Sequence, residues 1–371
     1  MNVAFRVDSS VMIGSGHVVR CRTLARELRH RGVSMRFICR EQRHHLSRLL
    51  TDDGFDVVML TARESVDRAQ GDGDYRAWLG ATEQADAADT VEALRGGQLD
   101  WVIVDHYGLG EVWESAMRST AGRILAIDDL ANRRHACDVL LDQNWFGDLT
   151  AGRYDGLVPA GCQTLLGPQH ALLPAEYRIF RAALPDADGS VRRVLVYFGA
   201  SDDHNLTAVA VRALSDPAFD GIAVDIVLGS NHPDAVSVER AAAGRAHTVI
   251  HQPLPTLAGL MARADLMVGT AGGTTWERAA LGLPGLVAIL TENQRLHIDP
   301  VRAGGAVFVM PAREVDSVDA WREELRRLTS DAVALSVTSK AARSLTDGGG
   351  TERVARVIVG SQEEGTLCRT H

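Results

Sequence analysis

The sequence contains few cysteines, and none of them lie close together. The five cysteines, Cys21, Cys39, Cys137, Cys162 and Cys368, are scattered over 371 residues without a CxxC pair. This spacing indicates neither a zinc site nor the disulfide framework of a small secreted domain. Cysteine usage of this kind fits a reducing compartment, so a cytoplasmic location is expected.

Long hydrophobic runs and an excess of positive charge are also missing. No apolar run is long enough to span a bilayer, and residues 1–10 lack the basic region and apolar core of a signal peptide. The 39 basic and 48 acidic residues give a net charge of −9, which argues against nucleic acid as a general partner. We therefore expect neither a membrane nor a nucleic-acid partner, and the oligomeric state stays open.

The sequence does contain a regular alternation of short apolar segments and segments with helical periodicity. Branched apolar residues at successive positions are typical of parallel strands that are covered on both faces. The alternation predicts an α/β fold with two Rossmann-like, doubly wound domains. The expected strands are 3–8, 35–39, 57–60, 101–106, 124–128 and 139–142 in the first half, and 224–228, 248–251, 266–268, 286–289 and 307–310 in the second.

The domain limits follow from a break in this pattern. Residues 181–190 are rich in Pro, Gly and Asp and are predicted to link the two domains. We expect an N-terminal domain over 1–182, a C-terminal domain over 191–360 and a flexible polar tail over 361–371. Two such domains that face each other across a cleft would bind a ligand at the carboxyl ends of their strands.

The loop after the first strand carries the first candidate residues. Gly14, Gly16 and His17 stand directly at the start of a long amphipathic helix. Glycine lets a ligand approach the backbone, and a helix N-terminus stabilises an anion. The same position disfavours positive charge, which suits a neutral imidazole that acts as a general base. Arg20, one turn on, is a candidate phosphate contact. The alternatives are a helix cap at His17 and a solvated Arg20.

Two further polar clusters end strands of the first half. Asp105, His106 and Tyr107 place three polar groups at one strand end, which favours a binding role over a simple helix cap. Asp128 and Asp129 are adjacent carboxylates, but neighbouring side chains of an extended chain point to opposite sides. We therefore expect a loop anchor at Asp129 and no metal site.

The second half opens with a loop that mirrors the first. Gly199, Ser201 and Asp202 follow its first strand, and small residues there suit a phosphate or a close backbone approach. These three residues are candidate contacts of a nucleotide.

A Gly/Thr loop later in the second half is a candidate diphosphate site. Gly272 and Gly273 offer backbone N–H groups, and Thr274 at the helix start can cap the helix or bind phosphate. Glu277, one turn on, can accept hydrogen bonds from two ribose hydroxyls, or it simply interacts with the helix dipole.

Amide side chains follow the next buried strand. Asn293 and Gln294 can contact polar groups of a sugar, or Asn293 caps a helix. Polar or glycine-containing loops thus recur at strand ends in both halves. This combination makes a nucleotide-linked substrate the leading hypothesis.

These motifs, in this order, resemble a known enzyme family. The matching segments are 5–32, 78–90, 102–107, 124–144, 165–173, 198–205 and 269–294. They are similar to the UDP-2,4-diacetamido-2,4,6-trideoxy-β-L-altropyranose hydrolases of pseudaminic acid synthesis, which are relatives of the spore-coat polysaccharide protein SpsG. The second half also resembles the donor-binding half of the MurG glycosyltransferase, and the GT-B fold of this family agrees with two Rossmann-like domains.

The resemblance implies a UDP-sugar hydrolase that needs neither a metal nor a cofactor. His17 would act as the general base, activating water for inverting attack at the anomeric carbon with release of UDP. Tyr107 falls where the family has a tyrosine in the sugar pocket, and Glu277 and Asn293 fall in its substrate-binding motifs. Ala200 and His170 depart from the usual glycine and aromatic residue, which affects the expected substrate preference rather than the reaction.

Two other functions fit the same loops. A GT-B glycosyltransferase would use the UDP-sugar as a donor and bind an acceptor hydroxyl in place of water. The sequence shows no basic amphipathic helix that would form a membrane-facing acceptor surface. A sensor that binds the nucleotide sugar without turnover is the other alternative, and the complete loop around His17 speaks against it.

Overall fold

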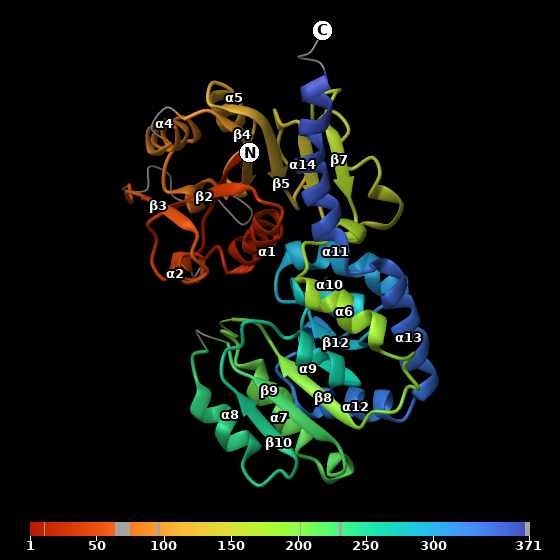
Figure 1. Cartoon of the computed structure of the whole chain (residues 1–371). Coiled ribbons are helices and arrows are strands. Elements are labelled where there is room, and N and C mark those ends of the chain that lie inside the picture. The colour runs from red at the N-terminus through yellow and green to blue at the C-terminus, as the bar shows by residue number, and fades with distance from the viewer. Residues whose placement is uncertain (11, 64–74, 95–96, 201, 230–231, 368–371) are drawn as a thin grey trace. The chain divides into compact units, whose positions relative to one another are not determined.

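The computed structural model describes residues 1–371 apart from 11, 64–74, 95–96, 201, 230–231 and 368–371. Contacts divide the chain into two compact units. The first unit comprises Met1–Asn144, Asp148–Leu172 and Gly350–His371, and the second comprises Trp145–Gly147 and Leu173–Gly349. Each unit has a β-sheet flanked by helices (Figure 1), so the predicted pair of Rossmann-like domains is confirmed.

The first unit contains a 7-stranded parallel sheet with the order β3-β2-β1-β4-β5-β6-β7. The strand order reverses between β1 and β4, and ligands of such folds bind at this switch point, beyond the carboxyl ends of the strands. The strands are β1 (Asn2–Val7), β2 (Ser34–Arg40), β3 (Asp56–Leu60), β4 (Leu99–Asp105), β5 (Ala121–Ile127), β6 (Val139–Asp142) and β7 (Gln163–Leu166).

The second unit contains a 6-stranded parallel sheet with the order β10-β9-β8-β11-β12-β13. Its switch point lies between β8 and β11. The strands are β8 (Arg193–Tyr197), β9 (Ala223–Val227), β10 (Thr248–His251), β11 (Leu266–Thr270), β12 (Gly285–Ala288) and β13 (Phe308–Val309).

Helices connect most successive strands, as the alternating sequence pattern predicts. In the first unit they are α1 (Gly16–His30), α2 (Ser47–Asp52), α3 (Arg76–Leu79), α4 (Glu83–Ala93), α5 (Glu111–Met117) and α14 (Gly350–Leu367). In the second unit they are α6 (Ala175–Ala183), α7 (Leu206–Leu214), α8 (Ala235–Ala242), α9 (Ala258–Arg263), α10 (Thr274–Leu281), α11 (Glu292–Ala303), α12 (Val318–Thr329) and α13 (Ala332–Leu345).

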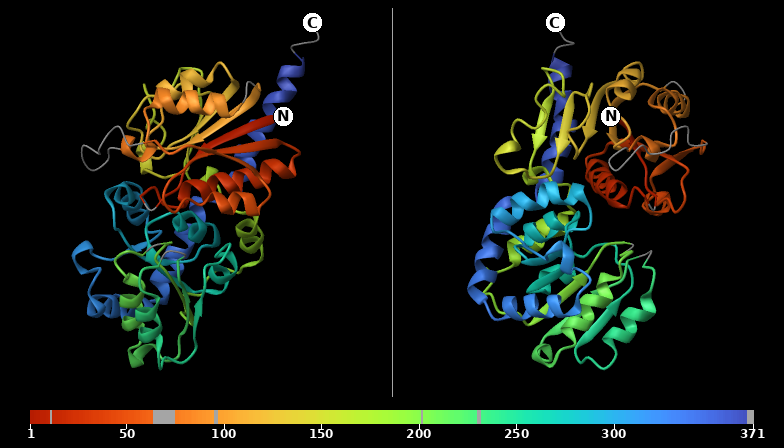
Figure 2. Two further views of the ribbon diagram at one scale, coloured as in Figure 1. Left: turned by 90° about the vertical axis from the view of Figure 1, so that its left-hand side faces the viewer. Right: turned by 180° about the vertical axis from the view of Figure 1, so that it is seen from behind.

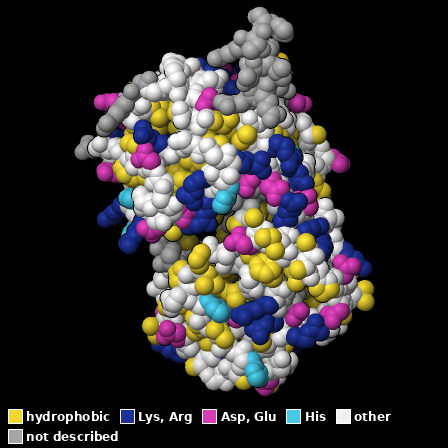
Figure 3. Space-filling model, in the orientation of Figure 1, with side chains coloured by type: hydrophobic (Ala, Val, Ile, Leu, Met, Phe, Trp, Pro, Cys, Tyr) yellow, Lys and Arg dark blue, Asp and Glu magenta, His cyan; other side chains and the backbone are white. Residues whose placement is uncertain are grey.

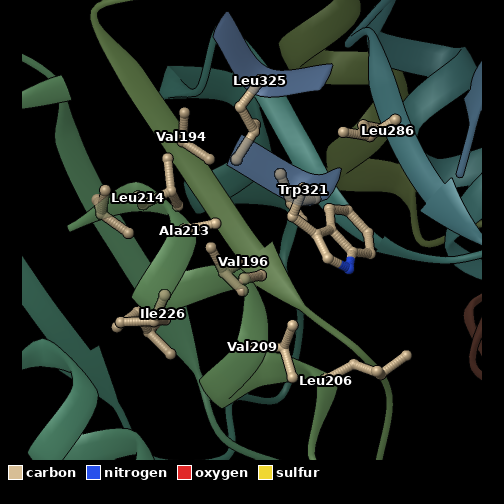
Figure 4. Packing of buried hydrophobic residues seen from close by; sticks show 14 of the residues in the cluster. Val194, Val196, Leu206, Val209, Ala213, Leu214, Ile226, Leu286, Trp321 and Leu325 are labelled. Carbon is tan, nitrogen blue, oxygen red and sulfur yellow. The ribbon is translucent and has the colours of Figure 1, made fainter. Parts of the chain in front are cut away.

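The core of the second unit explains why the sequences of its strands are continuous apolar runs. Val194 and Val196 of β8 are fully buried against Trp321 and Leu325 of α12 (Figure 4). The indole N–H of Trp321 donates to the carbonyl of Val315 at 2.7 Å, so this large side chain is buried without an unpaired polar group.

The unit boundaries differ from those predicted by the sequence, because α6 packs on the second unit. Tyr177 on α6 is fully buried, and its hydroxyl lies 3.8 Å from the sulfur of Met261. Arg181 donates to the carbonyl of Ala280 at 2.8 Å. The chain therefore enters the second unit near residue 173, and residues 181–190 connect α6 to β8 inside that unit.

The C-terminal helix α14 returns to the first unit. Val354, Ala355 and Ile358 are fully buried in the core that also contains Val3 and Phe5 of β1. Both views of Figure 2 show this blue helix beside the strands of the first unit. Residues 350–360 thus belong to the first unit, and residues 361–367 continue the helix where the sequence predicts a flexible tail.

Every strand predicted from the sequence is present, with small shifts at the ends. The sequence analysis missed β7, a short strand at the edge of the first sheet. Its first two residues, Gln163 and Thr164, are exposed, so it lacks the continuous apolar pattern of a covered strand.

The surface carries both charge signs in close proximity. On the face shown in Figure 3, arginine and acidic side chains are interspersed. None of the helices in the described residues combines the length and apolar character needed to cross a membrane.

Candidate active site

At the switch point of the first unit, a histidine and an aspartate form a buried pair. His17 is the second residue of α1, and Asp105 is the last residue of β4. The His17 Nδ1 lies 2.6 Å from Asp105 Oδ1, and the Asp105 side chain is completely buried. The ionised Asp105 accepts a hydrogen bond from Nδ1–H, which leaves Nε2 as the ring nitrogen that can contact a water molecule.

Arg20 connects this pair to a second carboxylate. Its Nε and Nη2 donate to Asp105 at 2.6 and 2.7 Å, and its Nη1 donates to both oxygens of Asp129 at 2.8 and 3.0 Å. Arg20 as a whole is only 8% exposed. Because its donors face carboxylates of the same unit, we propose that Arg20 positions Asp105 and does not contact phosphate.

Asp129 anchors the neighbouring loops, as the sequence predicts. It accepts a hydrogen bond from the Tyr107 hydroxyl at 2.7 Å and another from Asn144 Nδ2 at 2.8 Å. The Tyr107 ring meets the His17 ring edge to face, with centroids 4.6 Å apart. Residues that follow β1, β4, β5 and β6 therefore meet at one edge of the sheet.

The electrostatics keep Asp105 ionised. Burial alone would raise the pKa of the Asp105 carboxyl, but the Arg20 guanidinium and His17 lower it well below its ordinary range. His106, the next residue, is also buried, and this burial lowers its pKa to about 4. His106 is therefore neutral near pH 7. Its Nδ1 accepts from the Gly108 backbone, which fixes the loop that carries Tyr107.

A second cluster of buried charges lies in the same unit and includes Asp8, which directly follows β1. Arg6 of β1 pairs with Asp8 at 2.6 Å and with Asp86 of α4 at 2.7 Å, and Arg40 also donates to Asp86 at 2.7 Å. The Asp8 carboxylate accepts from the Arg40 backbone N–H at 2.7 Å. Paired charges of this kind hold the loop after β1 in place, because a buried charge without its partner is costly.

The two glycines of the first loop have different structural roles. Gly14 has φ of +79°, and its N–H donates to the Ser10 carbonyl at 2.9 Å in a tight turn. An added Cβ at Gly16 would meet no protein atom within 4 Å among the described residues, so the helix start is open on that side.

In the equivalent loop of the second unit, a carboxylate caps the helix that follows. Asp202 accepts from the backbone N–H groups of Leu206 and Thr207, both at 2.9 Å, and lies 3.3 Å from His232 Nε2. A carboxylate already occupies the N-terminus of α7, so an anionic ligand is disfavoured there. We therefore propose a capping role for Asp202 and no contact with a nucleotide. Gly199 lies two residues after the end of β8 with φ of +103°, and Ser201 lies outside the described residues.

The N-terminus of α10 is the candidate anion site of the second unit. Its N-cap residue is Gly273, which has no side chain that could cap the helix. A Cβ at Gly273 would meet nothing within 4 Å, so a ligand has room to approach the backbone of Gly272, Gly273 and Thr274. Within the described residues, the hydroxyl of Thr275 is buried and has no hydrogen-bond partner. Sequence analysis missed this residue, although it continues the Gly/Thr motif.

Glu277 lies one turn into α10 in an unusual environment. Burial raises its pKa to about 7, although the Tyr177 hydroxyl and the Arg278 guanidinium both favour the ionised form. Ionisation of this buried carboxylate costs less when ligand hydroxyls donate hydrogen bonds to it, so the site favours such a ligand. Of the two amide residues, Gln294 accepts from the Leu290 backbone N–H at 2.9 Å, and the N-cap position of α11 is Thr291 and not Asn293.

The structure thus gathers the candidate residues into two groups. Gly14, Gly16, His17, Arg20 and Tyr107 lie together in the first unit, and Gly272, Gly273, Thr274 and Glu277 lie together in the second. Among the described side chains, no group of three or more His, Cys, Asp or Glu residues is arranged to hold a metal ion.

Comparison with known proteins connects this arrangement to nucleotide-sugar chemistry. No family model matches the sequence. The chain is 28% identical over 178 residues to the UDP-2,4-diacetamido-2,4,6-trideoxy-β-L-altropyranose hydrolase of Campylobacter jejuni, covering 48% of this chain and 53% of that protein. It is 21% identical to the spore coat polysaccharide biosynthesis protein SpsG of Bacillus subtilis, over 96% of this chain and 98% of SpsG.

A third relative is an uncharacterised protein of Methanocaldococcus jannaschii, 23% identical over 335 residues. The chain spans 63% of the length of this protein, as it spans about half of the hydrolase.

The solved structures that resemble the chain have the GT-B fold. MurG of Acinetobacter baumannii matches with a TM-score of 0.62 at 16% identity, covering 97% of this chain and 99% of MurG. CalG4, the calicheamicin glycosyltransferase, matches with a TM-score of 0.64 at 16% identity, covering 100% of this chain and 98% of CalG4. At this identity the likeness shows the fold alone. The predicted GT-B-like fold is confirmed, and an enzyme that acts on nucleotide sugars agrees with these relatives.

Proposed function

We propose that the protein hydrolyses UDP-2,4-diacetamido-2,4,6-trideoxy-β-L-altropyranose, or a closely similar UDP-sugar, to UDP and the free sugar. The observation that carries this proposal is the buried pair of His17 and Asp105, in which the Nε2 of His17 is left as a base for water. The similarity to the Campylobacter hydrolase supports the same reaction.

The proposed reaction is a single displacement at the anomeric carbon. His17 Nε2 takes a proton from water while the water oxygen forms its bond to C1. The bond from C1 to the β-phosphate oxygen breaks, and its electron pair leaves with UDP. Asp105 stabilises the imidazolium that forms, as the carboxylate of a Ser-His-Asp triad does. Attack opposite the leaving group inverts the anomeric configuration.

The second unit is proposed to hold the nucleotide. The backbone N–H groups at Gly272 and Gly273 and the N-terminus of α10 would stabilise the diphosphate as it leaves. Glu277 would accept hydrogen bonds from the ribose hydroxyls. A diphosphate is a weakly basic leaving group, so these donors can replace a strong general acid.

Replacing Glu277 is expected to weaken UDP binding. Loss of two hydrogen bonds to a charged acceptor predicts a Kd about 10- to 100-fold higher for Glu277→Ala. Isothermal titration calorimetry with UDP measures this change. Glu239→Ala, an exposed glutamate on α8, is the matched control and should bind UDP like the unmodified protein. An unchanged Kd for Glu277→Ala would leave Glu277 as a carboxylate that only favours the helix dipole.

The raised pKa of Glu277 also predicts a pH dependence of UDP binding. The ribose hydroxyls require the ionised carboxylate, so affinity should fall as the pH drops below about 7. UDP itself titrates, so the difference between the unmodified protein and Glu277→Gln isolates the protein's contribution. We expect that difference to vanish in acid. A constant ratio of the two Kd values across pH would contradict the assignment.

The decisive experiment is incubation of the protein with the UDP-sugar in the absence of an acceptor, followed by NMR. Release of free sugar with the inverted anomer formed first is the expected result. A parallel reaction with EDTA tests whether a metal is needed. Retention of intact UDP-sugar by a protein that binds UDP would refute the hydrolase and favour a glycosyltransferase that needs an acceptor.

A further inference from the structure

Three aromatic side chains form a cluster that contacts His17 through Tyr107, although aromatic residues make up only 5% of the chain. Tyr75 precedes α3, Trp78 lies on α3, and Tyr107 follows β4. Ring centroids are 4.6 Å apart for Tyr75 and Trp78, 5.0 Å for Tyr75 and Tyr107, and 5.8 Å for Trp78 and Tyr107. All three are partly exposed, whereas Trp101 and Trp113 of the same unit are fully buried.

The surrounding contacts hold these rings in place. The Gln42 amide donates to the Trp78 carbonyl at 2.7 Å, and the Tyr107 hydroxyl donates to Asp129. A Cβ at Gly108 would lie 2.9 Å from the Tyr75 carbonyl, so only glycine lets these two loops pack so closely. A preorganised aromatic surface binds a ligand with little loss of side-chain entropy.

We propose that Tyr75 and Trp78 extend the sugar subsite, in which the family resemblance already places Tyr107, and that they select a sugar with apolar substituents. This inference rests on the proposed function. A water activated by His17 must reach the anomeric carbon, so the sugar ring has to lie next to the imidazole. The Tyr107 ring already contacts that imidazole. The aromatic surface therefore lies within reach of the sugar ring.

The chemistry of the surface indicates the class of sugar. Aromatic faces pack more favourably against C–H and methyl groups than against hydroxyls, because a hydroxyl on a ring face gives up hydrogen bonds to water. A sugar that lacks the 6-hydroxyl and carries acetamido groups presents more apolar surface than a fully hydroxylated hexose. Trp78 should therefore contribute more to binding a deoxy, N-acetylated sugar than to binding glucose.

The test compares Trp78→Ala and Trp78→Phe with the unmodified protein. We expect kcat/KM for the diacetamido-trideoxy substrate to fall about 3- to 10-fold in Trp78→Ala, with most of it restored in Trp78→Phe. The Kd of UDP should stay unchanged in both variants, because UDP is proposed to bind the second unit. An equal loss of UDP affinity, or an unchanged kcat/KM, would overturn the subsite.

A fluorescence titration separates this inference from the hydrolase proposal. In His17→Ala, where turnover is not expected, the diacetamido-trideoxy UDP-sugar should change tryptophan emission more than UDP or UDP-glucose does. Trp78→Phe in the same background should remove the difference. If the unmodified protein proves not to be a hydrolase, this titration still decides the subsite. Equal changes with UDP and the UDP-sugar would overturn it.

Independently, two cysteines of the first unit lie in contact. Cys137 precedes β6 and Cys162 precedes β7, and their sulfur atoms are 3.7 Å apart. The N–H of Gln163 donates to the carbonyl of Asp138 at 2.9 Å, which fixes the two strand starts side by side. Cys137 is buried and Cys162 is partly exposed, so an oxidant can reach one of the two thiols.

We infer that Cys137 and Cys162 form a reversible disulfide when the protein meets a disulfide oxidant such as oxidised glutathione. The Cys162 thiolate attacks the oxidant and releases one glutathione thiolate. The Cys137 thiolate then attacks Cys162 and releases the second, so two protein thiols are oxidised and one glutathione disulfide is reduced. The hydrogen bond from Cys137 supports the order of attack, because it lowers the pKa of Cys162 and raises that of Cys137.

Mass spectrometry of the protein treated with oxidised glutathione tests this inference. We expect the loss of two hydrogen masses, a linked peptide containing Cys137 and Cys162, and a higher Tm that a reductant reverses. Cys162→Ser should abolish all three effects, and Cys39→Ser should leave them intact. A stable glutathione adduct on Cys162, or two thiols that stay free, would overturn the inference.

Discussion

Replacement of His17 by alanine is expected to lower the rate of UDP release by about 10²- to 10⁴-fold, the range that a general base contributes. The variant loses the only proposed acceptor for the water proton. The diphosphate donors at the start of α10 belong to another unit, so UDP should bind the variant with unchanged affinity.

His30→Ala is the matched control for this experiment. His30 ends the same helix and is exposed, so its loss should leave both turnover and UDP binding unaffected. Rates come from a coupled UDP-release assay, and UDP affinity comes from calorimetry. Near-normal turnover in His17→Ala would remove the general base from the mechanism.

Asp105→Asn is expected to have an effect of similar size, although Asp105 does not touch the substrate in the proposed reaction. An amide in place of the carboxylate no longer stabilises the imidazolium, and it can present N–H to His17 and select the wrong tautomer. We expect kcat to fall by at least about 10²-fold, with little change in the Kd of UDP.

The same substitution also reports on the fold. Arg20 would lose Asp105, the fully buried one of its two carboxylate partners, and breaking a buried pair costs about 3–5 kcal/mol. A lower Tm is therefore expected, and UDP binding shows whether the second unit stays folded. Asp129→Asn removes the other Arg20 partner but not the hydrogen bond to His17. If both variants lose the same activity, Asp105 contributes through the ion pairs alone and not through His17.

The sequence could identify His17 but not its partner. Position at a helix start after a strand is a local signal, and it is visible in a single motif. The pairing of His17 with Asp105 joins residues 88 positions apart, through the register of β1 and β4. In the sequence, Asp105 is only one member of a polar strand end. Nothing local distinguishes an aspartate that orients a histidine from one that caps a helix.

Arg20 and Asp202 show what a local motif leaves open. Both stand in or just after loops that suit a phosphate or a nucleotide. The structure commits the Arg20 guanidinium to two carboxylates and the Asp202 carboxylate to two backbone N–H groups. Whether a charged side chain faces a ligand or a neighbour depends on what the tertiary fold places beside it.

The sequence by itself determined the two Rossmann-like sheets, because covered parallel strands leave continuous apolar runs that are read locally. It also determined the glycine loops at α1 and α10. Only the tertiary structure decided which helix start is capped by a carboxylate, which carboxylate meets His17, and that α14 returns to the first unit. These features depend on contacts between residues that are distant in the sequence. Such contacts match side-chain shape and charge in space, and they produce no periodic pattern along the chain.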